Sequence, residues 1–246
     1  MATERRRLDR PAFYALASGG WRDLVTLLHP PYTAWHLSYV ALGAAAAPTI
    51  HAGRLVATLA AFFLAVGVSA HALDELTGRP LRTGLQRSTL LGLGAVGLAG
   101  AVGIGVAGAI LVSPLLAPLV LLGAVLVPAY NLELAGGRFH NELWFAVAWG
   151  GFPAFTGYFA QTLTIRPAGV LVAAACCALS AAQRRLSTPV RLLRRGTAKV
   201  SGEQRLTDGS TVDLTKEHLA EPLEGALSAL WIAIVLLAAG LVAAKL

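Results

Sequence analysis

The folds that this sequence can adopt are limited by residues 88–129, a long uninterrupted apolar stretch that carries no charge. It is about twice as long as the roughly 20 apolar residues that a helix needs to cross a bilayer. Hydrophobic residues make up 56% of the 246 residues and charged residues only 13%, about half the charged share of a typical soluble domain. This composition predicts an all-α, polytopic bundle of membrane-spanning helices.

Seven segments are apolar and long enough to be predicted as membrane spans. They are residues 33–50, 54–73, 88–107, 110–130, 142–162, 166–183 and 223–244. The third and fourth share the uncharged stretch, so we expect the chain to turn near Ser113. Gly150, Gly151 and Pro153 predict a kink in the fifth span.

The remaining segments are polar and are expected on the cytoplasmic side. Residues 1–30 form an arm, in which apolar residues mixed with charges favour a helix lying in the interface. Residues 31–246 form a single transmembrane domain, with a polar cap at residues 184–222. Alternation around Asp208-Gly209 predicts a β-hairpin within that cap.

Basic residues set the expected orientation. With the N-terminus in the cytoplasm, every Lys and Arg except Arg54, Arg166 and Lys245 lies on the cytoplasmic side, as the positive-inside rule requires. Every Asp and Glu lies there too, which that rule does not require. We therefore expect an integral protein of the cell's inner (plasma) membrane whose polar site faces the cytoplasm. The net charge of +7 indicates contact with anionic membrane lipids, not with nucleic acid.

Four stretches, in order along residues 20–195, resemble the UbiA-type intramembrane prenyltransferases. They are WRDLVTLLHPPYTAWHLSYVALGAAAAP, DELTGRPL, AYNLELAGGRFHNELWFAVAWGGFPAFTGYFAQ and RRLSTPVRLL. The resemblance implies a helical bundle whose inner helix ends surround one cavity. It also implies transfer of an isoprenoid chain from its diphosphate to an acceptor, with Mg²⁺ held by two aspartate-rich motifs.

The chain departs from both of those motifs. Aligned on Gly78-Arg79-Pro80-Leu81, Asp74 takes the last aspartate of the first motif; in a shifted register, His71 and Asp74 take the middle two. Neither register keeps three carboxylates. The second motif is absent, because no acidic residue occurs from 143 to 202.

Ionisable side chains near the inner span ends are the candidate site. His71 lies three residues before Asp74 and four before Glu75, which places them on one helical face. The predicted metal ligands are His71, Asp74, Glu75, Glu133 and His140, a mixed set that suits Mn²⁺, Zn²⁺ or Fe²⁺, whereas the resemblance implies Mg²⁺. Asp74 and Glu75 are the predicted catalytic residues. The predicted substrate- or diphosphate-binding residues are Arg79, Arg138, Arg184, Arg185 and Asn131.

Simpler interpretations stay open beside these. Asp74 and Glu75 suit solvated ion pairs with Arg79 and Arg82, and the arginines after residue 183 suit anchoring to anionic lipid.

The sequence is compatible with three functions. The favoured one is an enzyme acting on an isoprenoid or prenyl lipid. The alternatives are a non-catalytic protein that binds or transports a prenyl lipid, quinone or carotenoid, and a membrane scaffold. The sequence leaves the oligomeric state open.

Overall fold

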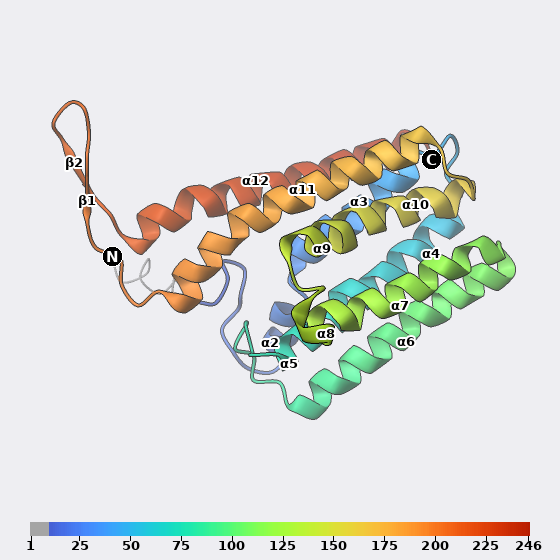
Figure 1. The fold of residues 1–246 in the computed structure, drawn as a ribbon, viewed down its shortest axis with the longest axis horizontal. Coiled ribbons are helices and arrows are strands. Elements are labelled where there is room, and N and C mark those ends of the chain that lie inside the picture. The colour runs from blue at the N-terminus through green and yellow to red at the C-terminus, as the bar shows by residue number, and fades with distance from the viewer. Residues whose placement is uncertain (1–9) are drawn as a thin grey trace.

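Helices run side by side along one long axis in the computed structural model, which describes residues 10–246 (Figure 1). Five helical segments within this part of the chain are long and apolar enough to cross a membrane. They are Ala52–Leu76, Arg87–Leu111, Pro114–Asn131, Pro167–Gly196 and Lys216–Ala243. The structure thus supports an all-α membrane bundle.

The five segments are built from named elements. The first comprises α4 (Ala52–Phe62), η1 (Phe63–Ala70) and α5 (His71–Leu76), and the second is α6 (Arg87–Leu111). The third comprises η2 (Pro114–Leu116) and α7 (Ala117–Asn131). The last two are α11 (Pro167–Arg191) with η4 (Leu192–Gly196), and α12 (Lys216–Ala243).

The two other predicted spans fall on shorter helices that pack against these. The predicted span 33–50 corresponds to α3 (Pro30–Ala45). The predicted span 142–162 is divided into α9 (Glu142–Ala146), the π-helical segment η3 (Val147–Gly151) and α10 (Phe152–Thr162). The expected irregularity of this helix is thus a π-helical segment. A total of seven spans stays a prediction.

The turn expected near Ser113 is present. Helix α6 ends at Leu111, and Ser113 begins the short η2 turn that leads into α7. The Ser113 hydroxyl accepts a hydrogen bond from the Leu115 N–H at 3.3 Å. A serine at this position satisfies a backbone donor that the start of a helix leaves unpaired.

Helices α3 and α10 approach each other through glycine. A Cβ atom added to Gly43 of α3 would lie only 1.9 Å from the Ala154 carbonyl oxygen of α10. No rotation of a side chain can relieve this contact, because the position of a Cβ is fixed by its own backbone and its partner is a backbone oxygen. The close approach fixes α3, which carries two residues of the site described below.

Gly43→Ala is therefore expected to destabilise the protein by about 1–3 kcal/mol, the usual cost of overpacking a core. Thermal unfolding in detergent measures the effect. Gly53→Ala in α4 is the matched control, since a Cβ there meets no atom within 4 Å; we expect it to be neutral or stabilising. Equal melting temperatures for Gly43→Ala and the wild type would contradict the packing described here.

One end of the bundle gathers most of the polar loops, and we call it the polar end. It carries residues 10–20 of the arm, the short helix α2 (Trp21–Leu27), the loops 77–86 and 132–141, and residues 197–215. The loop 132–141 contains one helical turn, α8 (Leu134–Gly137). The C-terminus lies at the opposite end, where Lys245 donates a hydrogen bond to the Ala47 carbonyl (Figure 1). Within residues 10–29, the arm is helical only in α2, which is shorter than the expected interfacial helix.

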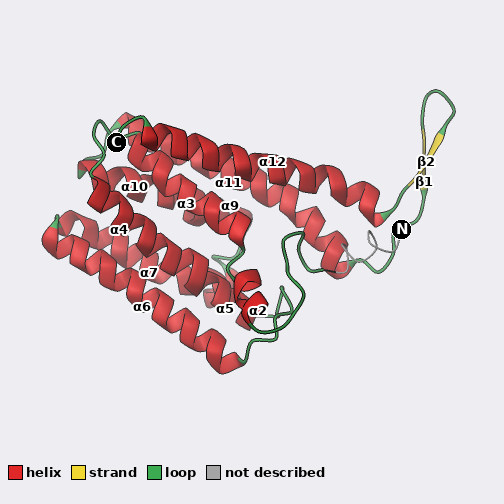
Figure 2. Ribbon diagram, turned by 180° about the vertical axis from the view of Figure 1, so that it is seen from behind, coloured by secondary structure: helices red, strands yellow, loops and turns green. Residues whose placement is uncertain are grey.

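The predicted hairpin is confirmed. Strand β1 (Glu203–Arg205) pairs antiparallel with β2 (Thr211–Asp213), with Gln204 opposite Val212. Gly209 has a φ of 86° in the connecting turn, a conformation that glycine adopts without strain. The hairpin projects away from the bundle beyond the ends of α11 and α12 (Figure 2).

Candidate functional site

A cavity of about 350 Å³ opens among the helix ends at the polar end. We call it the polar cavity. Its walls come from the arm, α3, η1, α5, α7, α9, η3, α11 and η4. The titratable side chains that line it are Tyr14, His29, Tyr32, His36, His71, Asp74, Tyr130, His140, Arg184, Arg191, Arg194 and Arg195. Residues from segments far apart in the sequence thus share one cavity.

The structure brings half of the predicted site residues to this cavity. Those that line it are His71, Asp74, Asn131, His140 and Arg184. Those that do not line it are Glu75, Arg79, Glu133, Arg138 and Arg185. Arg138 and Arg185 are exposed, and Arg79 donates hydrogen bonds to the carbonyls of Thr83 and Leu85 in its own loop.

Glu75 lies beside Asp74 in the sequence but points into the protein. It is completely buried, and its carboxylate accepts hydrogen bonds from the Leu81 and Thr83 N–H groups and from the Thr83 hydroxyl, at 2.8–2.9 Å. Through these three hydrogen bonds, the Glu75 carboxylate fixes the conformation of the loop 77–86. The contacts make Glu75 a structural residue of this loop.

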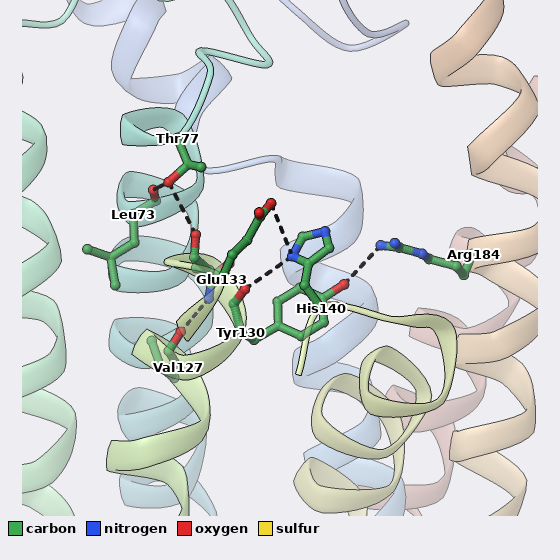
Figure 3. A network of polar contacts seen from close by, with 8 residues as sticks. Leu73, Thr77, Val127, Tyr130, Glu133, His140 and Arg184 are labelled. Atoms are coloured by element: carbon green, nitrogen blue, oxygen red, sulfur yellow. Dashed lines mark hydrogen bonds and ion pairs between the residues drawn. The ribbon is translucent and has the colours of Figure 1, made fainter. Parts of the chain in front are cut away.

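Tyr130, His140 and Glu133 form a small network at the end of α7 (Figure 3). His140 stacks on the Tyr130 ring with 4.6 Å between ring centroids, and its Nδ1 lies 3.1 Å from the Tyr130 carbonyl oxygen. The Glu133 carboxylate is 3.9 Å from the same Nδ1 and is half exposed. Glu133 therefore contacts His140 from outside the cavity.

Basic side chains form one wall of the polar cavity. Arg184, Arg191 and Arg195 are spaced by seven and four residues, which places them on one helical face. The Arg184 guanidinium donates to the Tyr130 hydroxyl at 2.9 Å (Figure 3) and lies 4.9 Å from the centre of the Phe145 ring. None of the three arginines forms an ion pair within residues 10–246.

The cavity carries an excess of positive charge. Arg194 is neutralised by Glu224 of α12, which accepts two of its hydrogen bonds. Asp74 is the one carboxylate among the described residues that line the cavity. Within residues 10–246, three lining arginines have no acidic partner and only one aspartate accompanies them, which gives the site a net preference for an anion. Guanidinium groups bind phosphate oxygens in pairs.

The described residues do not fit the metal site that the resemblance implies. No three His, Cys, Asp or Glu side chains gather within residues 10–246 so as to hold a metal ion. Of the five predicted ligands, Glu75 is used by its loop and Glu133 lies outside the cavity. The metal site that the resemblance implies takes carboxylates from two aspartate-rich motifs, whereas Asp74 is the one carboxylate that residues 10–246 contribute to the cavity lining.

The arm closes one side of the polar cavity. Arg194 and Arg195 donate hydrogen bonds to the carbonyls of Arg10 and Pro11, and the Tyr14 hydroxyl lies 2.6 Å from Nδ1 of His29. Burial lowers the pKa of His29 well below its usual value, and the nearby His71 imidazole and Arg195 guanidinium lower it further. His29 is therefore neutral at pH 7.

This pKa predicts a loss of stability in mild acid. The unfolded chain protonates His29 near its ordinary pKa of about 6.5, whereas the folded protein does so only at lower pH. Stability is therefore complete above that pH and falls below it, by up to about 1.4 kcal/mol per pH unit. Thermal unfolding from pH 7 to 5 measures the slope. We expect a shallower slope for His29→Gln, and equal slopes would contradict this assignment.

A second, apolar pocket of about 150 Å³ lies between α4, α6, α7 and α10. We call it the apolar pocket. Its lining is almost entirely apolar, with only Arg54, Thr58 and Thr156 as polar members. Val66 of η1 and Trp149 of η3 line both this pocket and the polar cavity. The two spaces therefore meet at these two side chains.

Some residues of the cavity were not predicted from the sequence as site residues. Arg191 and Arg195 were expected to anchor to lipid, and His29 and Tyr14 were given no role. The spacing of Arg184, Arg191 and Arg195 is the signal that could have identified Arg191 and Arg195 as site residues. It places all three on the helical face that Arg184 presents to the cavity.

Comparison with family models, with curated proteins and with solved structures finds no match for this chain. The resemblance to the UbiA-type prenyltransferases stays a prediction from the four sequence stretches.

Proposed function

We propose that this membrane protein binds a prenyl lipid, with an anionic phosphate headgroup in the polar cavity and the isoprenoid chain in the apolar pocket. The observation that carries the proposal is that the two spaces meet at Val66 and Trp149. A single amphiphilic molecule that passes between these two side chains would occupy both spaces. A purely anionic ligand would leave the apolar walls without a partner, and a purely apolar ligand would leave the arginines without one.

The headgroup assignment is supported by charge and size. Arg184, Arg191 and Arg195 have no acidic partner within residues 10–246, so an anion gains charge-assisted hydrogen bonds without displacing an existing ion pair. The polar cavity has about 350 Å³, within the range of about 300–1,000 Å³ that is usual for ligand sites.

An isoprenoid is the chain that the UbiA-type resemblance implies, and an apolar pocket open to neighbouring helices suits it. The same resemblance implies prenyl transfer, and in that case His71 and Asp74 are the cavity residues that we propose to act on the reacting group. The polar end is the basic end, so the positive-inside rule favours a headgroup site facing the cytoplasm.

Ligand titration of the purified protein tests this function. We expect farnesyl diphosphate to raise the melting temperature in detergent, and inorganic diphosphate and farnesol each to raise it less. Lipids released from gently purified protein and identified by mass spectrometry should include a prenyl phosphate. Stabilisation by farnesol equal to that by farnesyl diphosphate would favour an uncharged ligand such as a quinone or carotenoid. No shift with any of the three would contradict the proposal.

A further inference from the structure

The polar cavity has a second wall, which accepts hydrogen bonds. We call it the acceptor wall, and it consists of His36 of α3, Asp74 of α5, and His140 just before α9. The arginines of α11 and η4 supply only donors. A phosphate supplies acceptors for those arginines, but it leaves the acceptor wall without the donors that it needs.

The tautomers of the two histidines follow from their neighbours. Nδ1 of His36 lies 2.5 Å from the Tyr32 carbonyl oxygen, and Nδ1 of His140 lies 3.1 Å from the Tyr130 carbonyl oxygen. A carbonyl oxygen only accepts, so Nδ1 carries the proton in both rings. The remaining nitrogen of each neutral imidazole, Nε2, is therefore an acceptor.

Two members of the acceptor wall, His36 and Asp74, have no hydrogen-bond partner for these groups within residues 10–246. Nε2 of His36 is buried and forms no hydrogen bond within residues 10–246, although the His36 side chain lines the cavity and is only 5% exposed. The Asp74 carboxylate forms neither a hydrogen bond nor an ion pair in the same part of the chain. Leaving a buried polar group unpaired costs about 1–3 kcal/mol, so a ligand donor at this wall is stabilising.

The donor is a neutral hydroxyl. An ammonium group would find Asp74 favourable, but it would share the cavity with Arg184, Arg191 and Arg195, which outnumber that carboxylate. A hydroxyl donates one hydrogen bond without bringing a charge. Because both walls face one cavity, the hydroxyl and the phosphate belong to the same headgroup.

We propose that the headgroup is a polyol phosphate, whose phosphate contacts the arginines while its hydroxyls donate to Asp74 and to the two histidines. This inference rests on the proposed function and specifies its ligand. It gives Asp74 the role of a hydroxyl acceptor in place of the metal-ligand role that the UbiA-type resemblance implies.

Two lipids that differ only in hydroxyl groups test the inference. Farnesyl glyceryl phosphate and farnesyl propyl phosphate carry the same charge and chain, and the second lacks the two hydroxyls. We expect the wild-type protein to bind the glyceryl lipid about tenfold more tightly by titration calorimetry in detergent, the effect of a hydrogen bond to a charged group. Equal affinities would overturn this inference and leave the proposed function standing. Failure of both lipids to bind would overturn both.

Variants of the acceptor wall locate the effect. Asp74→Leu should reduce the affinity ratio of the two lipids to about one; the ratio is the readout, because loss of the carboxylate charge changes the binding of both phosphates alike. His140→Phe keeps an aromatic ring against Tyr130 and should reduce the ratio in part, so the test stands even if Asp74→Leu does not fold. His51→Phe at the opposite end is the control and should keep the wild-type ratio. An unchanged ratio in both cavity variants would overturn the assignment.

Discussion

Replacing both Arg191 and Arg195 by glutamine is expected to weaken the binding of farnesyl diphosphate by at least about 100-fold. Each guanidinium lines the polar cavity without a carboxylate partner within residues 10–246. A hydrogen bond to a charged group contributes about 1.5–3 kcal/mol, and the loss of two such contacts gives a change of this size. Titration calorimetry of the purified protein in detergent provides the measurement.

The matched control removes the same charge elsewhere at the polar end. Arg138→Gln combined with Arg185→Gln changes two exposed arginines that do not line the cavity, and we expect its affinity to stay within about twofold of the wild type. Arg195 also donates to the Pro11 carbonyl, so the melting temperature without ligand should be compared. Equal weakening in both double variants would show that net charge, not the cavity, attracts the ligand.

Glu75→Ala is expected to destabilise the protein by about 3 kcal/mol or more. The carboxylate is completely buried and accepts hydrogen bonds from two backbone N–H groups and one hydroxyl. Its removal leaves these donors without a partner inside the protein, and each unsatisfied buried group costs about 1–3 kcal/mol. Thermal or denaturant unfolding in detergent would measure the change.

Glu133→Ala is the control for this prediction, because the Glu133 side chain is 52% exposed and its carboxylate lies 3.9 Å from His140 Nδ1. We expect it to change stability by less than about 0.5 kcal/mol. Glu75→Gln keeps one acceptor oxygen but turns an amide donor toward N–H groups, so its stability should fall between those of the alanine variant and the wild type. If the Glu75→Ala protein were as stable as the Glu133→Ala protein, the proposed role of Glu75 in holding this loop would be wrong.

The parts of the fold predicted from the sequence are those that local chemistry determines. Long apolar segments identify membrane helices wherever they occur, Ser113 with Pro114 ends one helix and begins the next, and Asp208-Gly209 makes the hairpin turn. His71 and Asp74, which helical spacing predicts on one face, both line the cavity, whereas Glu75 of the same predicted face does not. Each of these features depends on residues close together in the chain.

Which of the other residues reach the cavity depends on the direction in which each helix face points. Asp74 and Glu75 are neighbours, but successive helical residues point about 100° apart, so one reaches the cavity and the other the loop 77–86. Glu133 has a φ of 51° in an irregular segment, which no helical spacing describes. From the sequence alone, Arg191 and Arg195 resemble lipid anchors. In the structure, α11 extends over the cavity and both side chains line it.

The π-helical character of η1 and η3 has a consequence for how this protein tolerates insertions and deletions. Val66 and Trp149, which join the two ligand spaces, lie in these segments. A π-helical turn holds one more residue than an α-helical turn, so deleting one residue from η1 would allow an ordinary α-helix to form. The side chains on either side of η1 would then keep nearly the same facing, whereas the same deletion in an ordinary α-helix would rotate those beyond it by about 100°. We therefore expect His71 and Asp74 to stay turned toward the cavity after a one-residue deletion in η1 and to turn away from it after a one-residue insertion in α5.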